Sequence, residues 1–480
     1  MFADTRAEAQ RLLGSFQRGE AMAVLKTALC AMLALAAVYA PGLLGADIFA
    51  DLGEGGRAAL GIMVFAASLW VTEAMPAFAV ALLVIGLQIA ILGRPGGVWA
   101  AQGDSQAWTV FVKPWSSPVM WLFLGGFVLA HACSKTDLDK WLAGAVLGRF
   151  ATNPAKLMAS VMGITFVFSM FMSNTATAAM MIAVTAPILR KIPQGSGMGK
   201  GLVLAVAVGA NLGGMGTIIG TPPNAIAAGE LSGRTDFVHW MMFAVPPAVI
   251  LASVVYGVLW WLYVRGTEFK AIEFDTQVSR GSKEKRQRFL VMLVFAVTVT
   301  LWVTESLTGI PSSVVSFIPI VGLAVFGVIE SKDMRELPWD VLLLLAGGLS
   351  LGVGVEVTGL ADWIASKVPP GLGVVGVAFV FSALGLVLSN LMSNTAAAAL
   401  LIPLASSLVG SESQIIVVVA VALSCSAAMA LPISTPPNAI AYGSGRIGSR
   451  DFLIPGFVVA AGITLVVPWL VMMLQGTTPK

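Results

Sequence analysis

Two nearly identical polar stretches, SNTATAA at Ser173–Ala179 and SNTAAAA at Ser393–Ala399, set the architecture of this chain. Each is followed by the same seven letters, TPPNAIA, which begin at Thr221 and at Thr435. A polar motif and a proline-broken motif that recur in the same order indicate an internal duplication, as in many membrane transporters. We therefore expect two halves, each of which contributes both motifs to a common site.

The composition is that of a membrane protein. Of the 480 residues, 57% are hydrophobic and only 11% are charged, and the mean hydropathy is +0.89. Polar side chains are therefore too few to cover a water-soluble globule of this size. A hydrocarbon core of roughly 30 Å takes about 20 apolar residues per crossing, and segments such as 23–44, 61–91 and 238–264 are long enough. We predict an all-α polytopic membrane protein embedded in the lipid bilayer.

The duplication extends beyond the two polar motifs. LWVTEAMP from Leu69 matches LWVTESLTGIP from Leu301, and FLGGFVLAHA from Phe123 matches LAGGLSLGVG from Leu345. The predicted organisation has five parts: an N-terminal cytosolic segment with the first transmembrane helix, 1–56; the first inverted repeat, 57–265; a cytosolic linker, 266–288; the second inverted repeat, 289–450; and the last transmembrane helix, 451–480.

Each repeat contains a segment that is too short for two full crossings and carries the SNT tripeptide near its centre. These segments, about 157–190 and about 371–410, are typical of re-entrant helical hairpins. Each precedes a helix interrupted by Gly and Pro, over about 201–230 and about 414–445. Inverted repeats whose broken helices meet near the middle of the bilayer are the architecture of many secondary transporters.

Basic residues orient the two hairpins. The first SNT segment is flanked by five of them, Arg149, Lys156, Arg190, Lys191 and Lys200. The second is flanked only by Lys367 with Asp362, and by Glu412. Under the positive-inside rule the first hairpin enters from the cytosol and the second from outside. We predict eleven transmembrane helices plus two re-entrant hairpins in the cytoplasmic (inner) membrane, with the N-terminus cytosolic and the C-terminus outside.

The doubled motifs supply neutral oxygens and donors at membrane depth. Ser, Asn and Thr bring hydroxyl and amide groups, while the paired prolines leave free backbone carbonyls on one side and a new helix N-terminus on the other. Oxygens suit a hard cation such as sodium, and helix N-termini suit an anion. The plainer alternative is that these residues merely bend and join membrane helices, but it does not require both motifs to recur in one order.

No Lys, Arg or His lies near the polar motifs, that is, between Lys156 and Arg190, between Asn211 and Ala228, between Gly371 and Gly410, or between Ser424 and Tyr442. An anion bound there would have no fixed positive side chain, so mobile cations must balance its charge. Two sodium ions would balance a dianion, whereas moving a bare dianion inward against −100 mV would cost about 4.6 kcal/mol. The scattered basic residues, with a net charge of only +3, also speak against nucleic-acid binding.

With these motifs in place, the chain resembles the divalent anion/sodium symporter family, the transporters of dicarboxylates, citrate and sulfate. The match runs through both SNT motifs, both TPPNAI loops and the LWVTEA segment, and so covers nearly the whole chain. The resemblance implies a homodimer in which a scaffold domain holds the interface. A transport domain with the hairpin tips and broken helices would move against it as an elevator.

The family pattern, carried over position by position, implies two sodium sites and one substrate site. The first sodium would meet Ser169, Ser173, Asn174 and Gly220, and the second Ser389, Ser393, Asn394 and Ser434. The substrate would meet Ser173, Asn174, Thr175, Ser393, Asn394 and Thr395, with Thr221 and Pro436 closing the pocket from the loops. Because Ser434 stands where the first half has Gly220, the second sodium site depends on a backbone carbonyl at that position.

We therefore expect a sodium-coupled symporter, not an enzyme, that imports C4 dicarboxylates such as succinate, fumarate or malate. Citrate or another tricarboxylate, sulfate, and sodium-independent dicarboxylate exchange are the alternatives among transporters. An intramembrane enzyme would need an acid, base, nucleophile or metal cluster at depth, which the doubled motifs lack. A channel would be recognised by much larger, non-saturating fluxes.

Ionisable residues near helix ends are expected to be structural. Glu73 and Glu305 recur in the repeat, and we expect each to cap a new helix or to lie at an interface rather than to carry protons. His131, near Lys135, and His239, next to Trp240, are expected to pack or to lie at the membrane interface.

Overall fold

The computed structural model describes residues 2–43, 48–100, 104–150, 153–231, 233–267, 282–367 and 372–475. All regular structure in these ranges is helical, which confirms the predicted all-α class. Nine described helices are long and apolar enough to cross a membrane, so the chain is a multi-pass membrane protein. Most of the linker predicted over 266–288, namely 268–281, lies outside the described residues.

The nine segments are a different set from the eleven transmembrane helices expected above. Two of the nine, Pro154–Phe171 and Gly373–Leu391, fall in the predicted hairpins. Shorter apolar helices lie over Ala77–Gly93, Ser312–Val325, Asn394–Ser407 and Ser411–Ala427. Gly and Pro divide several apolar stretches into helices of this shorter kind, and the count of eleven stays a prediction.

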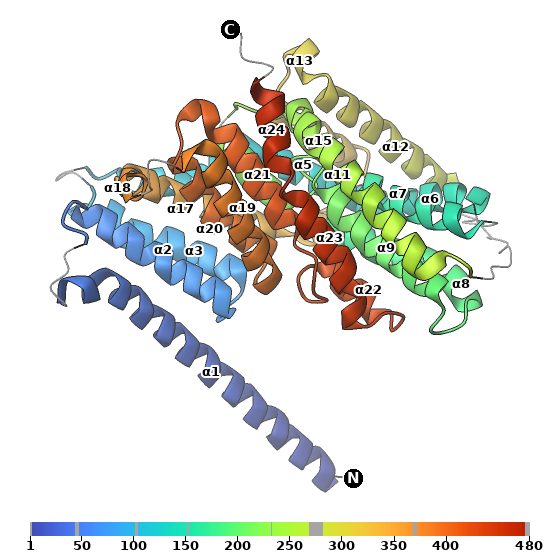
Figure 1. Ribbon diagram of the computed structural model, residues 1–480, viewed down its shortest axis with the longest axis horizontal. Helices are drawn as coiled ribbons and strands as arrows, with labels where there is room; N and C mark the ends of the chain where they lie inside the picture. Colours follow the sequence, from blue (N-terminus) through green and yellow to red (C-terminus); the bar gives the residue numbers. More distant parts are fainter. Residues whose placement is uncertain are drawn as a thin grey trace.

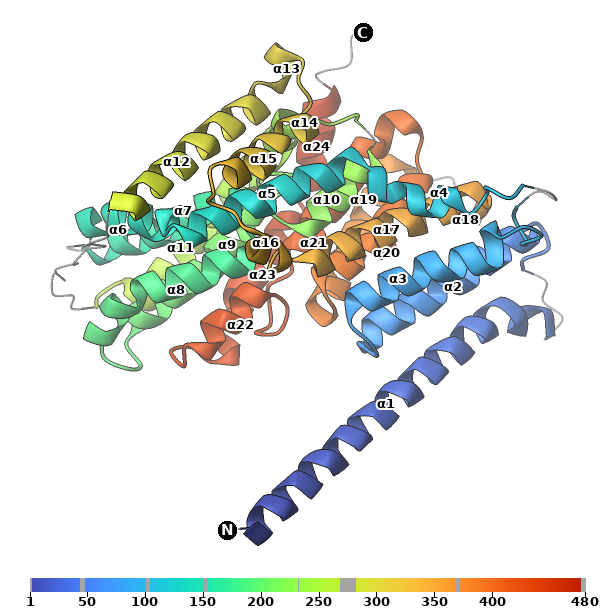
Figure 2. The same cartoon turned by 180° about the vertical axis from the view of Figure 1, so that it is seen from behind.

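The N-terminal helix stands apart from the rest. Helix α1 (Phe2–Leu43) extends beyond the bundle at its N-terminal end and meets the bundle along its C-terminal half (Figures 1 and 2). There it packs on α2 (Glu54–Thr72), and Lys26 Nζ donates to the Thr72 carbonyl at 2.9 Å.

The two repeats form two matching series of helices. The first series is α2, α3 (Ala77–Leu87), α5 (Pro118–Lys135), α6 (Leu138–Phe150), α7 (Pro154–Phe171), α8 (Asn174–Lys191), α9 (Gly197–Gly214), α10 (Pro222–Glu230) and α11 (Phe237–Leu259). The second is α12 (Ser282–Val303), α14 (Ser312–Val315) with α15 (Phe317–Val325), α17 (Trp339–Val357), α18 (Leu360–Lys367), α19 (Gly373–Leu391), α20 (Asn394–Ser407), α21 (Gln414–Ala427) and α22 (Pro436–Gly443). Two more helices, α23 (Leu453–Ile463) and α24 (Val466–Gln475), follow in the segment predicted as the last transmembrane helix. Three short helices, α4 (Thr109–Val112), α13 (Glu305–Thr308) and α16 (Ser331–Arg335), lie in the connections.

Each repeat packs against the other at corresponding places. The short helix α10 packs on α20 and α21, and its counterpart α22 packs on α8 and α9. Likewise α3 packs on α17, while α14 and α15 pack on α5. The segments therefore interleave in space (Figures 1 and 2), and neither repeat forms a separate unit.

Paired glycines allow two of these close approaches. In α17, a Cβ atom at Gly347 would lie 2.4 Å from the Ala81 Cβ, and one at Gly348 would lie 2.8 Å from the Ala399 Cβ. In α5, a Cβ atom at Gly125 would lie 2.5 Å from the Ser316 Cβ. Distances below 3 Å are shorter than van der Waals contact, so helices can approach this closely only where the side chain is a hydrogen.

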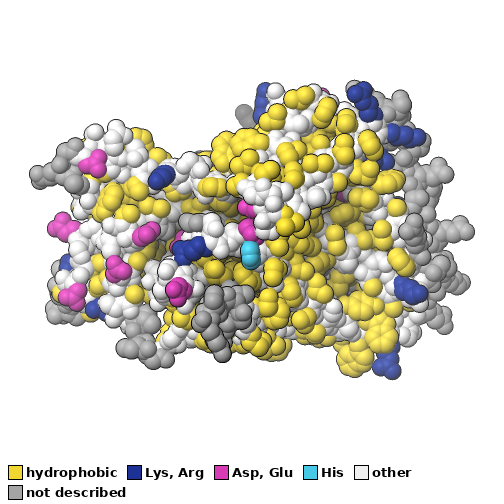
Figure 3. Space-filling view, turned by 90° about the horizontal axis from the view of Figure 1, so that it is seen from above, with side chains coloured by type: hydrophobic (Ala, Val, Ile, Leu, Met, Phe, Trp, Pro, Cys, Tyr) yellow, Lys and Arg dark blue, Asp and Glu magenta, His cyan; other side chains and the backbone are white. Residues whose placement is uncertain are grey.

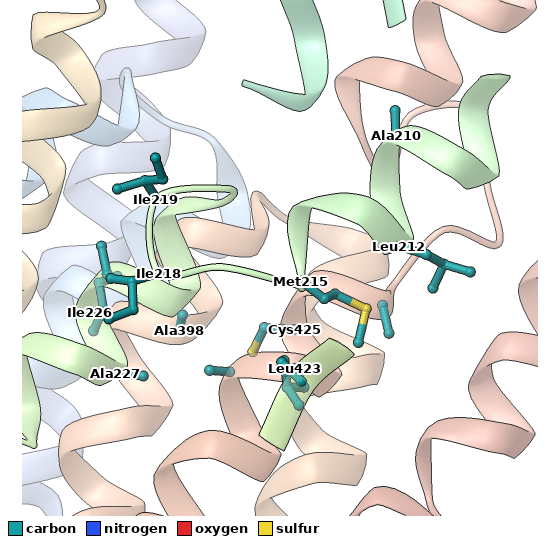
Figure 4. Packing of buried hydrophobic residues seen from close by; sticks show 14 of the residues in the cluster. Ala210, Leu212, Met215, Ile218, Ile219, Ile226, Ala227, Ala398, Leu423 and Cys425 are labelled. Carbon is teal, nitrogen blue, oxygen red and sulfur yellow. The ribbon is translucent and has the colours of Figure 1, made fainter. Parts of the chain in front are cut away.

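The centre of the bundle is formed by the broken helices, which are buried on all sides. Every residue of α9 from Leu202 to Gly214, and every residue of α21 from Val417 to Ala427, is buried. Figure 4 shows apolar side chains such as Met215 and Ile219 close to the first break.

The outer surface differs from the centre. Hydrophobic side chains cover most of the face in Figure 3, while acidic ones gather at the end where α18 and the start of α2 lie. Such an apolar exterior is expected where helices face lipid.

Candidate functional site

Both SNT serines cap the helix that follows them. Ser173 lies between α7 and α8, and its Oγ accepts a hydrogen bond from the Ala176 amide at 3.2 Å. Ser393 lies between α19 and α20, and its Oγ accepts from the Ala396 amide at 3.1 Å. A serine N-cap satisfies one of the free amides at a helix start and leaves others open. Each tip therefore presents a helix N-terminus, the partly positive end of the helix dipole.

The asparagine of each TPPN motif holds the adjoining helix break together. Asn224 Nδ2 donates to three carbonyls of the first break, those of Gly214 (3.0 Å), Met215 (3.2 Å) and Thr217 (2.7 Å). Asn438 Nδ2 donates to two carbonyls of the second, those of Met429 (2.9 Å) and Leu431 (2.8 Å). These carbonyls lose their helical partners at the break, and a buried carbonyl without a donor is costly. The asparagines therefore stabilise both breaks.

The same two asparagines also join the repeats to each other. Asn438 Oδ1 accepts from Asn211 Nδ2 of the first repeat at 3.0 Å, and Asn224 Oδ1 faces Ser426 Oγ of the second at 3.5 Å. All four side chains are buried. Our interpretation of the sequence quoted TPPN in both halves but gave these asparagines no role. Their recurrence in both copies was the signal that could have identified them.

In the first half-site, Ser169 and Asn174 meet two backbone carbonyls. Ser169 Oγ donates to the Ala210 carbonyl at 2.6 Å. The inward atom of the Asn174 amide lies 2.8 Å from Ser169 Oγ, 3.1 Å from the Gly220 carbonyl oxygen and 3.3 Å from the Ala210 carbonyl oxygen. With nitrogen inward, the amide donates to these oxygens. With oxygen inward, four oxygens converge with too few protons to pair them, which is the donor set that a hard cation uses.

The second half-site has oxygens with few or no hydrogen-bond partners. Asn394 Oδ1 and Ser424 Oγ are buried and have no partner among the described residues, and Ser389 Oγ lies beside the weakly bonding thiol of Cys425. Ser424 occupies the position that Ala210 has in the first repeat. Buried oxygens without donors cost free energy unless a ligand meets them. Their chemistry fits sodium, which needs oxygen atoms and no proton.

The side chain of Ser434, which stands where the first repeat has Gly220, is hydrogen-bonded to other protein groups. Its hydroxyl donates to Asn390 Oδ1 at 2.9 Å and accepts from the Leu431 amide at 3.0 Å. The side chain is therefore occupied within the loop, and the backbone carbonyl is the group that Ser434 shares with Gly220. The difference between the two residues does not by itself remove a ligand from the second half-site.

Asn390 is a further residue that the sequence interpretation missed. Its Oδ1 also accepts from the Ala430 amide at 3.0 Å, so it ties α19 to the second break. The equivalent position in the first repeat is Met170, whose carbonyl accepts a hydrogen bond from the Thr217 hydroxyl. Because Asn390 does not recur, a search for repeated residues passes over it.

The other predicted substrate residues lie around the tips and breaks with different exposure. Thr175, Ser393 and Pro436 are exposed, Ser173, Asn174, Asn394 and Thr395 are half-buried, and Thr221 is buried. No hydrogen bond among the described residues joins the Thr175 or Thr395 hydroxyl to the other predicted residues. The structure thus brings together Ser169, Asn174 and Gly220, but it does not bring Thr175 or Thr395 into contact with them through a hydrogen bond.

These features were compared with known proteins. The family model described as "Citrate transporter" (CitMHS) matches residues 67–423, which include both SNT motifs and the first TPPNAIA loop. The chain belongs to this family. The resemblance found in the sequence and the prediction of a transporter rather than an enzyme are both confirmed.

Two relatives and one solved structure extend the comparison. The sodium-dependent dicarboxylate transporter SdcS of Staphylococcus saprophyticus is 29% identical over 455 residues, which cover 85% of this chain and 84% of that protein. SdcS of Staphylococcus aureus is 28% identical over 471 residues, covering 88% and 87%. The crystal structure of the Alcanivorax borkumensis YdaH transporter matches with a TM-score of 0.54 at 13% identity, covering 82% of this chain and 97% of that one, and supports the fold alone.

Proposed function

We propose that this protein is a sodium-coupled symporter that imports C4 dicarboxylates such as succinate, fumarate or malate. The observation that carries the proposal is the pair of neutral oxygen clusters, one at Ser169 and Asn174 and one at Ser389 and Asn394. No Lys, Arg or His lies between Lys156 and Arg190 or between Gly371 and Gly410, so neither hairpin tip has a cationic side chain close to it in sequence to balance an anion. Relatives that align over most of the chain carry the name sodium-dependent dicarboxylate transporter, which agrees with this chemistry.

The proposed architecture has eleven transmembrane helices and two re-entrant hairpins in inverted repeats, within the five segments predicted above. The hairpins would be α7–α8 and α19–α20, and the broken helices α9–α10 and α21–α22. We assign these with α11, α23 and α24 to a moving transport domain, because α10 and α22 pack on the hairpins of the opposite repeats. The remaining helices would form the scaffold of a homodimer, with the N-terminus cytosolic and the C-terminus outside.

Asparagine orientation offers a coupling mechanism for the proposed site. Sodium would draw the Asn174 and Asn394 amide oxygens inward, together with the carbonyls of Gly220 and Ser434. The amide nitrogens would then face outward beside the helix N-termini capped by Ser173 and Ser393, where substrate carboxylates are expected. Thr175 and Thr395 would add hydroxyl donors, and Thr221 and Pro436 would border the pocket. Cation binding would thus prepare the anion site, because one side chain serves both.

The first experiment is uptake of radiolabelled succinate into proteoliposomes with an inward sodium gradient, compared with equimolar potassium. We expect accumulation with sodium only, and a further increase when the interior is negative if more than two sodium ions accompany each dianion. Uptake that is undiminished in potassium would contradict the proposal and favour sodium-independent exchange.

Citrate is a second candidate substrate, because the matching family is described as citrate transporters. Excess unlabelled citrate or sulfate in the same assay ranks the anions. We expect succinate, fumarate and malate to compete best. A transporter that accumulates labelled citrate with sodium, and that is hardly inhibited by succinate, would establish the second candidate instead.

A further inference from the structure

A cavity of about 420 Å³ separates the second hairpin tip from the turn between α2 and α3. Ser393 and Ala396 of the hairpin line one wall, while Trp70 and residues 73–77 line the other. In the proposed mechanism the first wall moves and the second belongs to the scaffold. The cavity is therefore a place where a fixed scaffold side chain can face the substrate.

The α2–α3 turn holds Glu73 in an uncommon backbone conformation. Glu73 ends α2 with φ 49° and ψ 41°, the left-handed region that residues other than glycine rarely adopt. Trp70, buried at 3% exposure, donates through Nε1 to the Ala77 carbonyl at 3.2 Å and closes the turn. Such conformations are energetically unfavourable and cluster at functional sites. The turn therefore maintains a defined position for the Glu73 carboxylate at the cavity.

The negative charge of Glu73 affects how anions bind in the cavity. Glu73 is the ionisable residue among those that line the cavity, and its side chain is exposed. The nearby ammonium of Lys26 donates to the Thr72 carbonyl and makes no ion pair with Glu73. A carboxylate that faces the anion site repels each negative charge of a bound substrate, and the repulsion grows with the number of charges.

We infer that Glu73 is a specificity-determining residue that favours dianions over trianions at the site beside Ser393. The inference rests on the proposed function, in which Ser393 meets a substrate carboxylate. A tricarboxylate with all three groups ionised would place an additional charge in the cavity. We expect the carboxylate to weaken its binding relative to a dianion by about three- to tenfold, the range for one charge pair in a wet cavity.

The chain offers a matched control in Glu305, the residue that occupies the same position in the second repeat. Glu305 begins the short helix α13, which lies at the edge of the molecule, away from α8 and α20 (Figures 1 and 2). Glu305→Gln removes the same charge from the same sequence motif without changing the cavity. Glu73→Asp keeps the charge at the cavity and controls for damage to the turn.

The experiment measures sodium-dependent succinate uptake with citrate as competitor, at one pH above and one pH below the third ionisation of citrate. For Glu73→Gln we expect the citrate inhibition constant, relative to the KM for succinate, to fall about three- to tenfold at the higher pH, and to change little at the lower pH. Glu305→Gln and Glu73→Asp should match the unmodified protein at both. If Glu73→Gln does not transport, the ratio of citrate to succinate dissociation constants in detergent replaces the kinetic ratio.

An unchanged ratio in Glu73→Gln would overturn the inference, and so would an equal change at both pH values. Failure of the proposed function has a different signature, because the unmodified protein would then show no sodium-dependent succinate uptake before any variant is made.

Discussion

The two halves of the site tie the hairpin to the break through different groups at equivalent hairpin positions, 170 and 390. In the first half, the Thr217 side chain of the break reaches the Met170 backbone of the hairpin. In the second half, the Asn390 side chain of the hairpin reaches the backbone amide of Ala430 in the break. The Ser, Asn and Thr side chains assigned to ligands at the two tips are the same in both halves, and Gly220 and Ser434 share a backbone carbonyl, whereas the ties that support these groups differ. Ligand chemistry thus restricts residue type more than the surrounding packing does.

The largest expected effect comes from removing the asparagine of the TPPN motif, which both halves contain. Asn224→Ala should leave three buried carbonyls without this donor, and Asn438→Ala should leave two together with the Asn211 amide. At roughly 1–3 kcal/mol for each unsatisfied group, either change should unfold the break and abolish uptake. Thermal unfolding in detergent and succinate uptake would measure both effects.

Asn153 supplies a matched control, since its Oδ1 accepts a hydrogen bond from the Lys156 amide at the start of α7, far from both breaks in sequence. Asn153→Ala should cost about 1 kcal/mol, as for other helix caps, and should leave uptake near normal. Wild-type stability in Asn224→Ala would show that the break does not depend on its side chain.

A second expectation concerns the shared amides. Asn174→Ala or Asn394→Ala should raise the half-maximal sodium concentration and the KM for succinate together, each about tenfold or more, because one amide is assigned to both ligands. Sodium titrations at several succinate concentrations separate the two effects. A variant that loses succinate binding while its sodium dependence is unchanged would refute the shared assignment.

Repetition explains both what the sequence predicted and what it missed. The sequence could locate the tips at Ser173 and Ser393 and the interruptions before Pro222 and Pro436. At these places polar residues, which are costly in an apolar segment, occur twice in the same order. Asn390 and Asn211 could not be located in this way, because their repeat partners are Met170 and Cys425, and a lone polar residue in an apolar helix has no partner until the fold supplies one. The interleaving of the two repeats is likewise a property of tertiary packing, which no local pattern encodes.

Exchanging Asn390 and Met170, which occupy equivalent positions, tests whether the two hydrogen bonds between hairpin and break are equivalent. Asn390→Met places the first-half residue in the second half and leaves the Ala430 amide and the Ser434 hydroxyl without their acceptor. We expect a loss of about 2–3 kcal/mol in the free energy of unfolding and a sodium affinity lowered several-fold. Met170→Asn retains the backbone carbonyl that Thr217 uses, so it should change both quantities less.

Scaffold contacts also differ between the halves. The second hairpin packs closely on α17 through α20, whereas in the first repeat α8 packs on α6, α9 and α22. Gly348→Val would place a Cβ atom 2.8 Å from the Ala399 Cβ, and Gly126→Val would place one 3.3 Å from Ile219 Cδ1. We therefore expect Gly348→Val to slow succinate uptake at least tenfold and Gly126→Val only a few-fold. Equal rates for the two variants would indicate that neither contact separates during transport.

The smallest effect should come from an ion pair between the repeats, which joins Lys135 to Asp333. Burial raises the pKa of the Asp333 carboxyl, but hydrogen bonds from Lys135 (2.6 Å), the Glu330 amide (2.7 Å) and His131 (3.3 Å) outweigh burial and hold the pKa below its ordinary value. Its stabilisation is complete at neutral pH and is lost as the pH falls below about 4 and through the lowered pKa. Asp333→Asn should lower the Tm by about 1–2 °C at pH 7, and by less in acid. An equal loss at both pH values would rule out a charge effect.

The packing of α10 on α20 and of α22 on α8 has a consequence for the origin of the protein. A half-length ancestor with one repeat would have had a short broken-helix segment and no hairpin of a second repeat to cover it. Two such chains, inserted in opposite directions, would have covered each other's segments. With the inverted orientation proposed above, the ancestral gene product would have tolerated both orientations in the membrane, and fusion of two copies would have made that antiparallel pairing permanent.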